Sequence, residues 1–217
     1  MIVTISALLL DHRQPKYQRF MMATTLSDAE IVEEVLEQEA TLRFPSFTSN
    51  DAFNIGSIIR AKFLAKHLPS SKAETISSIT STASSDGDRP PEWANRGIVI
   101  AISTFTGHDC LFGCVVGNEA EVTPDNWIWV EGKRNVVKRF NHSSYYMGRK
   151  LAAAGKTQES ANLPFPEYAT HGGAFPVWLR NAPSSPIAVI VVSGLPQRDD
   201  HMIVVETLKE YIPTLYQ

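Results

Sequence analysis

Apolar residues recur at helical spacing in two segments of the first part of the chain. Ser27 and Glu30 form a capping box, and apolar positions then line one face of the segment up to about Arg43. A second capping signal at residues 48–51 precedes another helical repeat of apolar residues, which stops at Pro69. The sequence therefore predicts two successive amphipathic helices in this region.

Short apolar runs rich in β-branched residues predict four strands further along the chain, at residues 97–105, 110–117, 174–180 and 187–195. Turn residues separate the first two runs and also the last two, so each pair is expected to form a hairpin. The strands of a hairpin run antiparallel to each other. We therefore expect an antiparallel sheet.

Three more helices are predicted around these hairpins, at residues 123–141, at residues 142–154 and from residue 199 onward. Helices that arrive from both ends of the chain and from its middle can cover both faces of a sheet. The pattern therefore indicates an α+β sandwich and not a parallel, doubly wound fold.

Composition indicates one domain with two additional segments. The chain has 217 residues, of which 43% are hydrophobic and 20% charged, as is typical of a globular protein with a single core. Residues 1–21 are expected to form a disordered N-terminal extension, and residues 22–217 to form the domain itself. Within the domain, residues 70–92 are rich in Ser and Thr, so we expect a flexible insertion there.

Charge and cysteine content exclude several classes of partner. The formal net charge of -3 argues against nucleic acid, because binding a polyanion calls for a basic surface. The N-terminal apolar run is shorter than the roughly 20 residues that span a bilayer, so no membrane partner is expected. Two cysteines cannot form a disulfide framework, which favours the cytoplasm as the location.

No standard catalytic motif occurs in the chain, so candidate chemistry has to be sought in three irregular segments. The first segment carries residues that could hold a carboxylate or phosphate where a helix begins: Arg139, His142, Ser143, Ser144 and Arg149. Together with nearby basic residues they make residues 133–149 an anion-attracting patch. In the alternative interpretation, Lys133, Arg134 and Lys138 form a solvated helix face and Ser143 is only an N-cap.

Each of the other two segments contains a histidine at a place where the chain bends. His171 is followed by Gly172 and Gly173, which allow the backbone to turn sharply or to approach a ligand; a simple bulge is the alternative. His201 lies in the first turn of the last predicted helix, where the helix dipole disfavours the imidazolium; capping or packing is the alternative. The histidine spacing matches no metal motif, so no metal site is expected.

Three blocks of the sequence resemble those of the haem-degrading-domain family, which includes GlcG-like and HbpS-like proteins: RFNHSSYYMG, EYATHGGAFPVW and VSGLPQRDDHMIVV. The resemblance is to the uncharacterised fungal and bacterial (UPF) branch of that family. It extends from about Leu26 to Tyr211 and is interrupted by the insertion at residues 70–92.

This resemblance implies a profilin-like, three-layer α/β/α sandwich with a five-stranded antiparallel sheet, assembled into a dimer or a higher ring. Four strands are visible in the pattern, so the fifth is expected at residues 157–170 or at residues 44–48. Some members of the family bind haem and are credited with degrading it, whereas others have no established activity. The residues that match the family's motifs, and that we carry over as site residues, are His142, Ser143, Tyr146, Gly148, His171, Gly172 and Gly173.

Two hypotheses of function follow. In the first, the protein is an oligomer that binds a small molecule, with haem or another carboxylate-bearing compound as the candidate ligand. His142 or His171 would then act as acid or base and Arg139 as an anion clamp, while Arg149 and His201 complete the ligand-binding set. No residue is assigned as a haem ligand. In the second, the protein is a non-catalytic oligomeric adaptor that recruits a partner through its acidic first helix or through the insertion.

Overall fold

The computed structural model describes residues 26–67 and 92–216. The extension expected at residues 1–21 lies outside the described residues, and so does the expected insertion, except for Glu92 at its end. Among the described residues, no helix has both the length and the apolar content needed to cross a bilayer.

The centre of the fold is a five-stranded sheet with the strand order β1-β4-β5-β2-β3. The strands are β1 (Arg43–Phe44), β2 (Gly97–Thr104), β3 (Cys110–Gly117), β4 (Ala174–Leu179) and β5 (Ala188–Ser193). The pairs β2–β3 and β4–β5 are antiparallel, as the two predicted hairpins require. The pair β2–β5, which joins the hairpins, is antiparallel as well. The fifth strand is β1, which begins one residue before the second of the two expected places.

The expectation of a purely antiparallel sheet is wrong for β1, which pairs with β4 in parallel. β1 is only two residues long and follows the first helix directly, so no hairpin dictates its direction. Its hydrogen bonding extends beyond the strand, because the backbone oxygen of Phe44 accepts the N–H of Arg180 at 2.9 Å. The sheet is therefore mixed.

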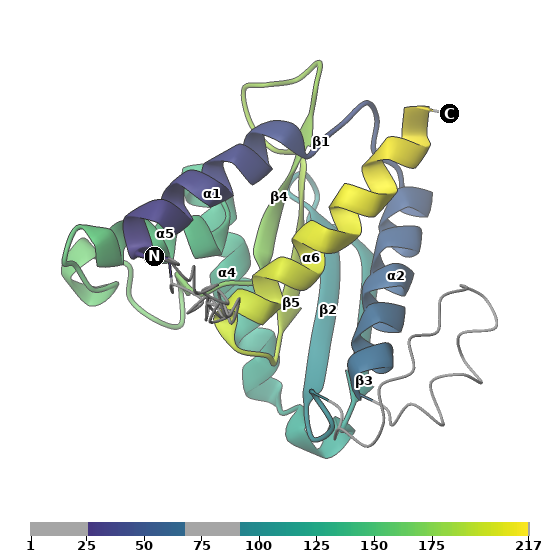
Figure 1. The fold of residues 1–217 in the computed structure, drawn as a ribbon, viewed down its shortest axis with the longest axis horizontal. Helices are drawn as coiled ribbons and strands as arrows, with labels where there is room; N and C mark the ends of the chain where they lie inside the picture. The colour runs from purple at the N-terminus through teal and green to yellow at the C-terminus, as the bar shows by residue number, and fades with distance from the viewer. Residues whose placement is uncertain (1–25, 68–91, 217) are drawn as a thin grey trace, which may run out of the picture.

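Within the described residues, five α-helices pack around the sheet: α1 (Asp28–Thr41), α2 (Ser49–His67), α4 (Pro124–Phe140), α5 (Ser144–Ala153) and α6 (Gln197–Tyr211). The helices α2 and α6 cover one face, and α4 covers the other, as Figure 1 shows. The strands separate two apolar clusters because successive side chains point to opposite faces; Ile100 faces α2 and α6, and Ala101 faces α4. The three-layer α/β/α sandwich is thus confirmed.

The remaining two helices, α1 and α5, pack against each other beside the sheet and share a third apolar cluster. Short 3-10 helices connect or extend the larger elements: η2 (Glu119–Glu121), η3 (Glu159–Ala161) and η4 (Ile212–Tyr216). The capping box predicted at Ser27 and Glu30 is present and begins α1. The first turn of α6 begins two residues before the predicted start at residue 199.

A buried ion pair joins α4 to α6 beneath the end of β5. Lys133 and Asp200 have side chains that are 3% and 2% exposed, and their Nζ and Oδ2 atoms are 2.9 Å apart. Lys133 also donates to the backbone oxygen of Val192 at 3.0 Å, and Asp200 accepts the backbone N–H of Leu195 at 3.0 Å. The interpretation of Lys133 as part of a solvated face is therefore wrong, because its charge is needed inside the fold.

Removing one member of this pair is expected to destabilise the protein strongly. Lys133→Met leaves the carboxylate of Asp200 buried without its counter-charge, which costs about 3–5 kcal/mol of unfolding free energy. The double variant Lys133→Met/Asp200→Leu should lose less unfolding free energy than the two single variants added together, because it leaves no unpaired charge buried. Urea unfolding at pH 7 measures these differences.

The matched control is Lys138→Met, because this lysine lies on the exposed side of the same helix. Its effect is expected to stay within about 0.5 kcal/mol. If Lys133→Met and Lys138→Met lowered the unfolding free energy by equal, small amounts, the importance assigned to the buried pair would be contradicted.

Candidate functional site

The histidines of the three motifs do not converge on one centre. Nδ1 of His142 lies 2.6 Å from a carboxylate oxygen of Glu39, and Nε2 of His201 lies 2.8 Å from the side-chain oxygen of Gln38. His171 packs instead against an aromatic ring of α4. Within residues 26–67 and 92–216, no group of three His, Cys, Asp or Glu side chains is arranged to hold a metal ion.

The segment from His142 to Tyr146 builds the start of α5 and docks it on α1. The buried carboxylate of Glu39 accepts both the imidazole N–H of His142 and the backbone N–H of Ser143, the latter at 2.7 Å. The Ser143 hydroxyl in turn accepts the N–H of Tyr146 and is the N-cap of α5. The N-cap interpretation of Ser143 is thus confirmed, and the hydroxyl is buried away from solvent.

Glycine is required after His171 because two backbones meet there. A Cβ atom at Gly172 would lie 1.8 Å from the backbone oxygen of Gln197. At Gly173, a Cβ would lie 2.1 Å from a β5 carbonyl oxygen, and its φ of +123° disfavours other residues. Ser144, also buried, accepts the first backbone N–H of β4. These three residues therefore position the loop that carries His171.

A cavity of about 410 Å³ opens between α4, α5 and the loop that precedes β4. Three of the residues expected in the site line it, namely Gly148, Arg149 and His171. Gly148 lets α5 approach the loop closely, since a Cβ there would lie 2.0 Å from the backbone oxygen of Thr170. The structure thus brings parts of the first two motifs together around one cavity.

The walls of this cavity combine aromatic and basic side chains. Trp129 and Phe165 have ring centroids 4.7 Å apart, and the ring of His171 meets Trp129 edge-on at 5.0 Å. Arg149 and Lys156 supply positive charge to the same walls, and Glu159 supplies one negative charge. An aromatic surface beside two cations suits a flat ligand that carries an anionic group.

Two polar atoms of the cavity-lining residues lack a hydrogen-bond partner among the described residues. They are Nε of Arg149 and the side-chain oxygen of Gln197, and both are excluded from solvent. The guanidinium of Arg149 is held from its other end by Asp28, at 2.8 Å from Nη1. Leaving a buried donor or acceptor unpaired costs about 1–3 kcal/mol, so a ligand that pairs with either atom would recover part of this cost.

The charge state of His171 is set by its surroundings. Partial burial lowers the pKa of its imidazole, and the positive charges of Lys133 and Arg149 lower it further. The imidazole is therefore mainly neutral at pH 7, with one nitrogen able to donate a hydrogen bond and the other able to accept one. A neutral imidazole of this kind can accept a proton or bind a metal centre of a ligand.

Other predicted site residues lie outside the cavity. Arg139 is exposed and stacks over Tyr168, with 5.0 Å between the guanidinium carbon and the ring centroid. His142 and Tyr146 pack against each other near α1, at 4.3 Å between centroids. His201 is fully buried, which matches the packing alternative considered for it.

The anion-attracting patch expected at residues 133–149 is mostly neutralised in the fold. Lys133 pairs with Asp200, Arg134 with Glu131 and Arg149 with Asp28, as the distances of 2.9, 3.2 and 2.8 Å show. The acidic partners come from α4 itself, from α6 and from α1. The Nε atoms of Arg134 and Arg149 still lack a partner among the described residues, and Arg149 is the one of the two that lines the α4–α5 cavity.

Sequence reasoning missed three residues that shape the site: Glu39, Phe165 and Gln197. Glu39 was not singled out by the helical pattern of the first helix, and it lies 103 residues before His142. Phe165 belongs to a proline-rich loop without regular spacing. Gln197 precedes the predicted start of the last helix, so no periodic pattern included it.

Comparisons with known proteins agree on one family. A family model described as "Haem degrading protein HbpS-like" matches residues 72–209. A UPF0303 protein of Burkholderia mallei (strain NCTC 10229) is 36% identical over 178 residues, which is 82% of this chain and 87% of that protein. A UPF0303 protein of Rhizobium etli is 45% identical over 116 residues, or 53% of this chain and 67% of that protein.

A solved structure supports the same fold. The crystal structure of the Ybr137w protein matches with a TM-score of 0.63 and 29% sequence identity, covering 84% of this chain and 88% of that one. The match extends over most of the described sandwich. The two relatives named above are bacterial, and the fungal side of the expected branch is not shown by them.

Burial of His201 makes the stability of the protein dependent on pH. Desolvation, with a smaller effect of the Arg198 charge, lowers the pKa of this imidazole to about 3. The unfolded chain takes up a proton near pH 6.5, whereas the folded protein does not until about pH 3, so stability falls as the pH drops between these values. From pH 6.5 to 4.5 the loss from this group is about 2 kcal/mol.

Urea unfolding as a function of pH measures this loss. His201→Leu removes the imidazole whose protonation lowers the stability. Its unfolding free energy should therefore decline less steeply below pH 6.5 than that of the unmodified protein. Gln38→Met keeps the imidazole buried and should retain the steep decline. Identical pH profiles for His201→Leu and the unmodified protein would contradict this assignment.

Proposed function

The chain belongs to the HbpS-like family of haem-degrading proteins, and from that premise we propose that it is an oligomeric protein that binds a small, flat, carboxylate-bearing molecule. Haem is the first candidate for this ligand. The observation that carries the proposal is the α4–α5 cavity, which places an aromatic pair, two cations and a neutral imidazole around a volume of about 410 Å³. Cavities of this size commonly hold small-molecule ligands.

The residues of the cavity fit the chemistry of haem. The rings of Trp129 and Phe165 offer apolar contact to a porphyrin, and Arg149 and Lys156 offer ion pairs to its carboxylates. Haem would supply an iron that can bind a histidine nitrogen. His171 is the histidine among the residues that line this cavity, so it is the side chain that we propose would hold the iron.

For a ligand that carries no metal, the same histidine is our candidate for acid–base chemistry. Because its pKa is lowered, His171 can accept a proton from a bound ligand at neutral pH. Arg149 lies on the same cavity and would stabilise a negative charge that develops on the ligand. His142 has its own carboxylate partner at another place in the fold and is not assigned to this step.

Oligomerisation is supported by apolar side chains exposed on the described surface. Phe53 is 61% exposed, and Trp127 and Ile128 are 43% and 41% exposed at the start of α4. Contact between copies of the chain would remove this apolar area from water. We place the protein in the cytoplasm because both cysteines, Cys110 and Cys114, are free thiols.

The second candidate function is a non-catalytic oligomeric adaptor. The exposed apolar side chains at Phe53, Trp127 and Ile128 favour it, because such residues can also bind a different protein. The two candidates differ in what the α4–α5 cavity does. Only the first requires a ligand there.

Haemin titration distinguishes the two candidates. The unmodified protein is expected to shift the Soret band saturably. His171→Ala is expected to weaken binding about tenfold or more and to alter the Soret maximum, because the nitrogen proposed to bind the iron is lost. His142→Ala serves as the matched control, since it removes a histidine that lies outside the cavity. Its titration curve should coincide with that of the unmodified protein.

If haemin shows the same saturable Soret shift with His171→Ala as with the unmodified protein, His171 is not the residue that binds the iron. The absence of any saturable shift would overturn haem as the ligand. A circular dichroism spectrum of each variant confirms that the fold is retained, so that a lost shift reports binding and not unfolding.

A further inference from the structure

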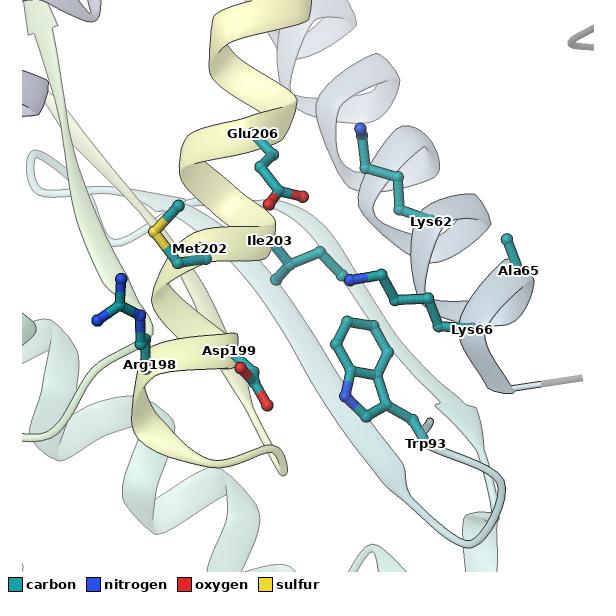
Figure 2. A pocket seen from close by; sticks show the side chains of 9 residues that line it. All are labelled: Lys62, Ala65, Lys66, Trp93, Arg198, Asp199, Met202, Ile203 and Glu206. Atoms are coloured by element: carbon teal, nitrogen blue, oxygen red, sulfur yellow. The ribbon is translucent and has the colours of Figure 1, made fainter. Parts of the chain in front are cut away.

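A second cavity, of about 430 Å³, lies between α2 and α6 on the face of the sheet opposite α4. Figure 2 shows that its walls come from the last turns of α2, the first turns of α6 and Trp93. None of its lining residues belongs to the α4–α5 cavity described above. Any ligand of this cavity would therefore contact a different set of side chains.

The indole of Trp93 gives this cavity an unsatisfied donor. Trp93 is 5% exposed and stacks on Phe63, with 5.7 Å between the ring centroids. Its Nε1 is excluded from solvent and has no hydrogen-bond partner among the described residues. In Figure 2 the edge of the ring that carries this nitrogen faces the first turn of α6, where Asp199 lies. An indole N–H can only donate, so the group it lacks is an acceptor.

Charges of both signs surround this donor. The ammonium of Lys66 lies 4.6 Å from the centroid of the Trp93 ring and 3.7 Å from a carboxylate oxygen of Glu92. Lys62 and Arg198 add two more cations to the lining, and Asp199 and Glu206 supply carboxylates from α6. In Figure 2 the side chains of Lys66 and Glu206 both extend into the gap between the two helices. A simple anion would leave the carboxylates of Asp199 and Glu206 without a ligand group to pair with, and a metal cation would be repelled by three basic side chains.

The rest of the cavity wall is apolar. Met202 and Ile203 of α6 and Ala65 of α2 contribute this surface. A ligand that pairs with all of these groups therefore needs a negatively charged hydrogen-bond acceptor, a positively charged group and an apolar portion. Those three features occur together in a free α-amino acid with an apolar side chain.

We propose that the α2–α6 cavity binds such an amino acid. Its carboxylate accepts the N–H of Trp93 and pairs with Lys66. Its ammonium group pairs with Asp199 and Glu206, and its side chain packs on the apolar wall formed by Met202 and Ile203. This proposal is independent of haem binding, since no residue is shared between the two cavities.

The indole N–H signals in a two-dimensional ¹H–¹⁵N NMR spectrum test the proposal directly, with L-leucine as the probe. The chain has four tryptophans, and Trp93→Phe identifies the signal of Trp93 by its disappearance. Titration with L-leucine should shift that signal downfield and saturably, because a carboxylate becomes its hydrogen-bond acceptor. The indole signal of Trp127, which lies on α4, serves as an internal control and should stay in place.

Calorimetry then measures what each group contributes. Trp93→Phe keeps an aromatic ring against Phe63 but removes the donor, and it should weaken L-leucine binding about tenfold. Glu206→Gln should weaken it as well, through the ammonium group. His171→Ala, which alters only the other cavity, should leave L-leucine binding unchanged.

Two analogues of L-leucine test whether the cavity recognises both charges of the ligand. Leucinamide lacks the carboxylate and 4-methylpentanoate lacks the ammonium group, and each should bind at least about tenfold more weakly than L-leucine. An unmoved Trp93 signal in a saturating concentration of L-leucine would overturn the proposal. Equal binding of L-leucine and 4-methylpentanoate would overturn the recognition of a zwitterion.

Discussion

The buried ion pair between Lys133 and Asp200 is the interaction on which the rest of the structure depends. It joins the helix on one face of the sheet to the helix on the other, at the point where β5 ends. Asp200 also accepts the backbone N–H groups of Gly194 and Leu195, so it determines how the chain turns from β5 into α6. Two charges removed from water are stable only when each has the other, which makes this junction intolerant of a change in one partner.

From that junction, close backbone contacts extend to the α4–α5 cavity. The first turn of α6 places the backbone oxygen of Gln197 against Gly172, and this contact holds the loop that carries His171. On the other side of the loop, Gly148 allows α5 to pack against it. The motif glycines therefore allow the backbones to approach closely because they have no side chain. The residues available to a ligand lie beside these close contacts.

The first turn of α6 contributes to both cavities. Gln197 lines the α4–α5 cavity, while Arg198 and Asp199 line the α2–α6 cavity. In each cavity a buried polar atom lacks a partner among the described residues, and in each case basic side chains lie close to it. The cavities differ in their remaining chemistry. One offers two aromatic rings and a neutral imidazole, and the other offers carboxylates opposite an ammonium and an apolar wall.

The sequence by itself determined most of the helices and the two hairpins, because capping boxes, turn residues and the spacing of apolar positions act between near neighbours. It also indicated His171 and its glycines as a special segment. Only the tertiary structure decided that β1 runs parallel to β4, and that Lys133 is an internal charge. The partners that make these choices lie far away in the chain: 67 residues separate Lys133 from Asp200, and 103 separate Glu39 from His142. Local patterns carry no information about such pairs, since the charge on a helix face is the same whether the fold exposes or buries it.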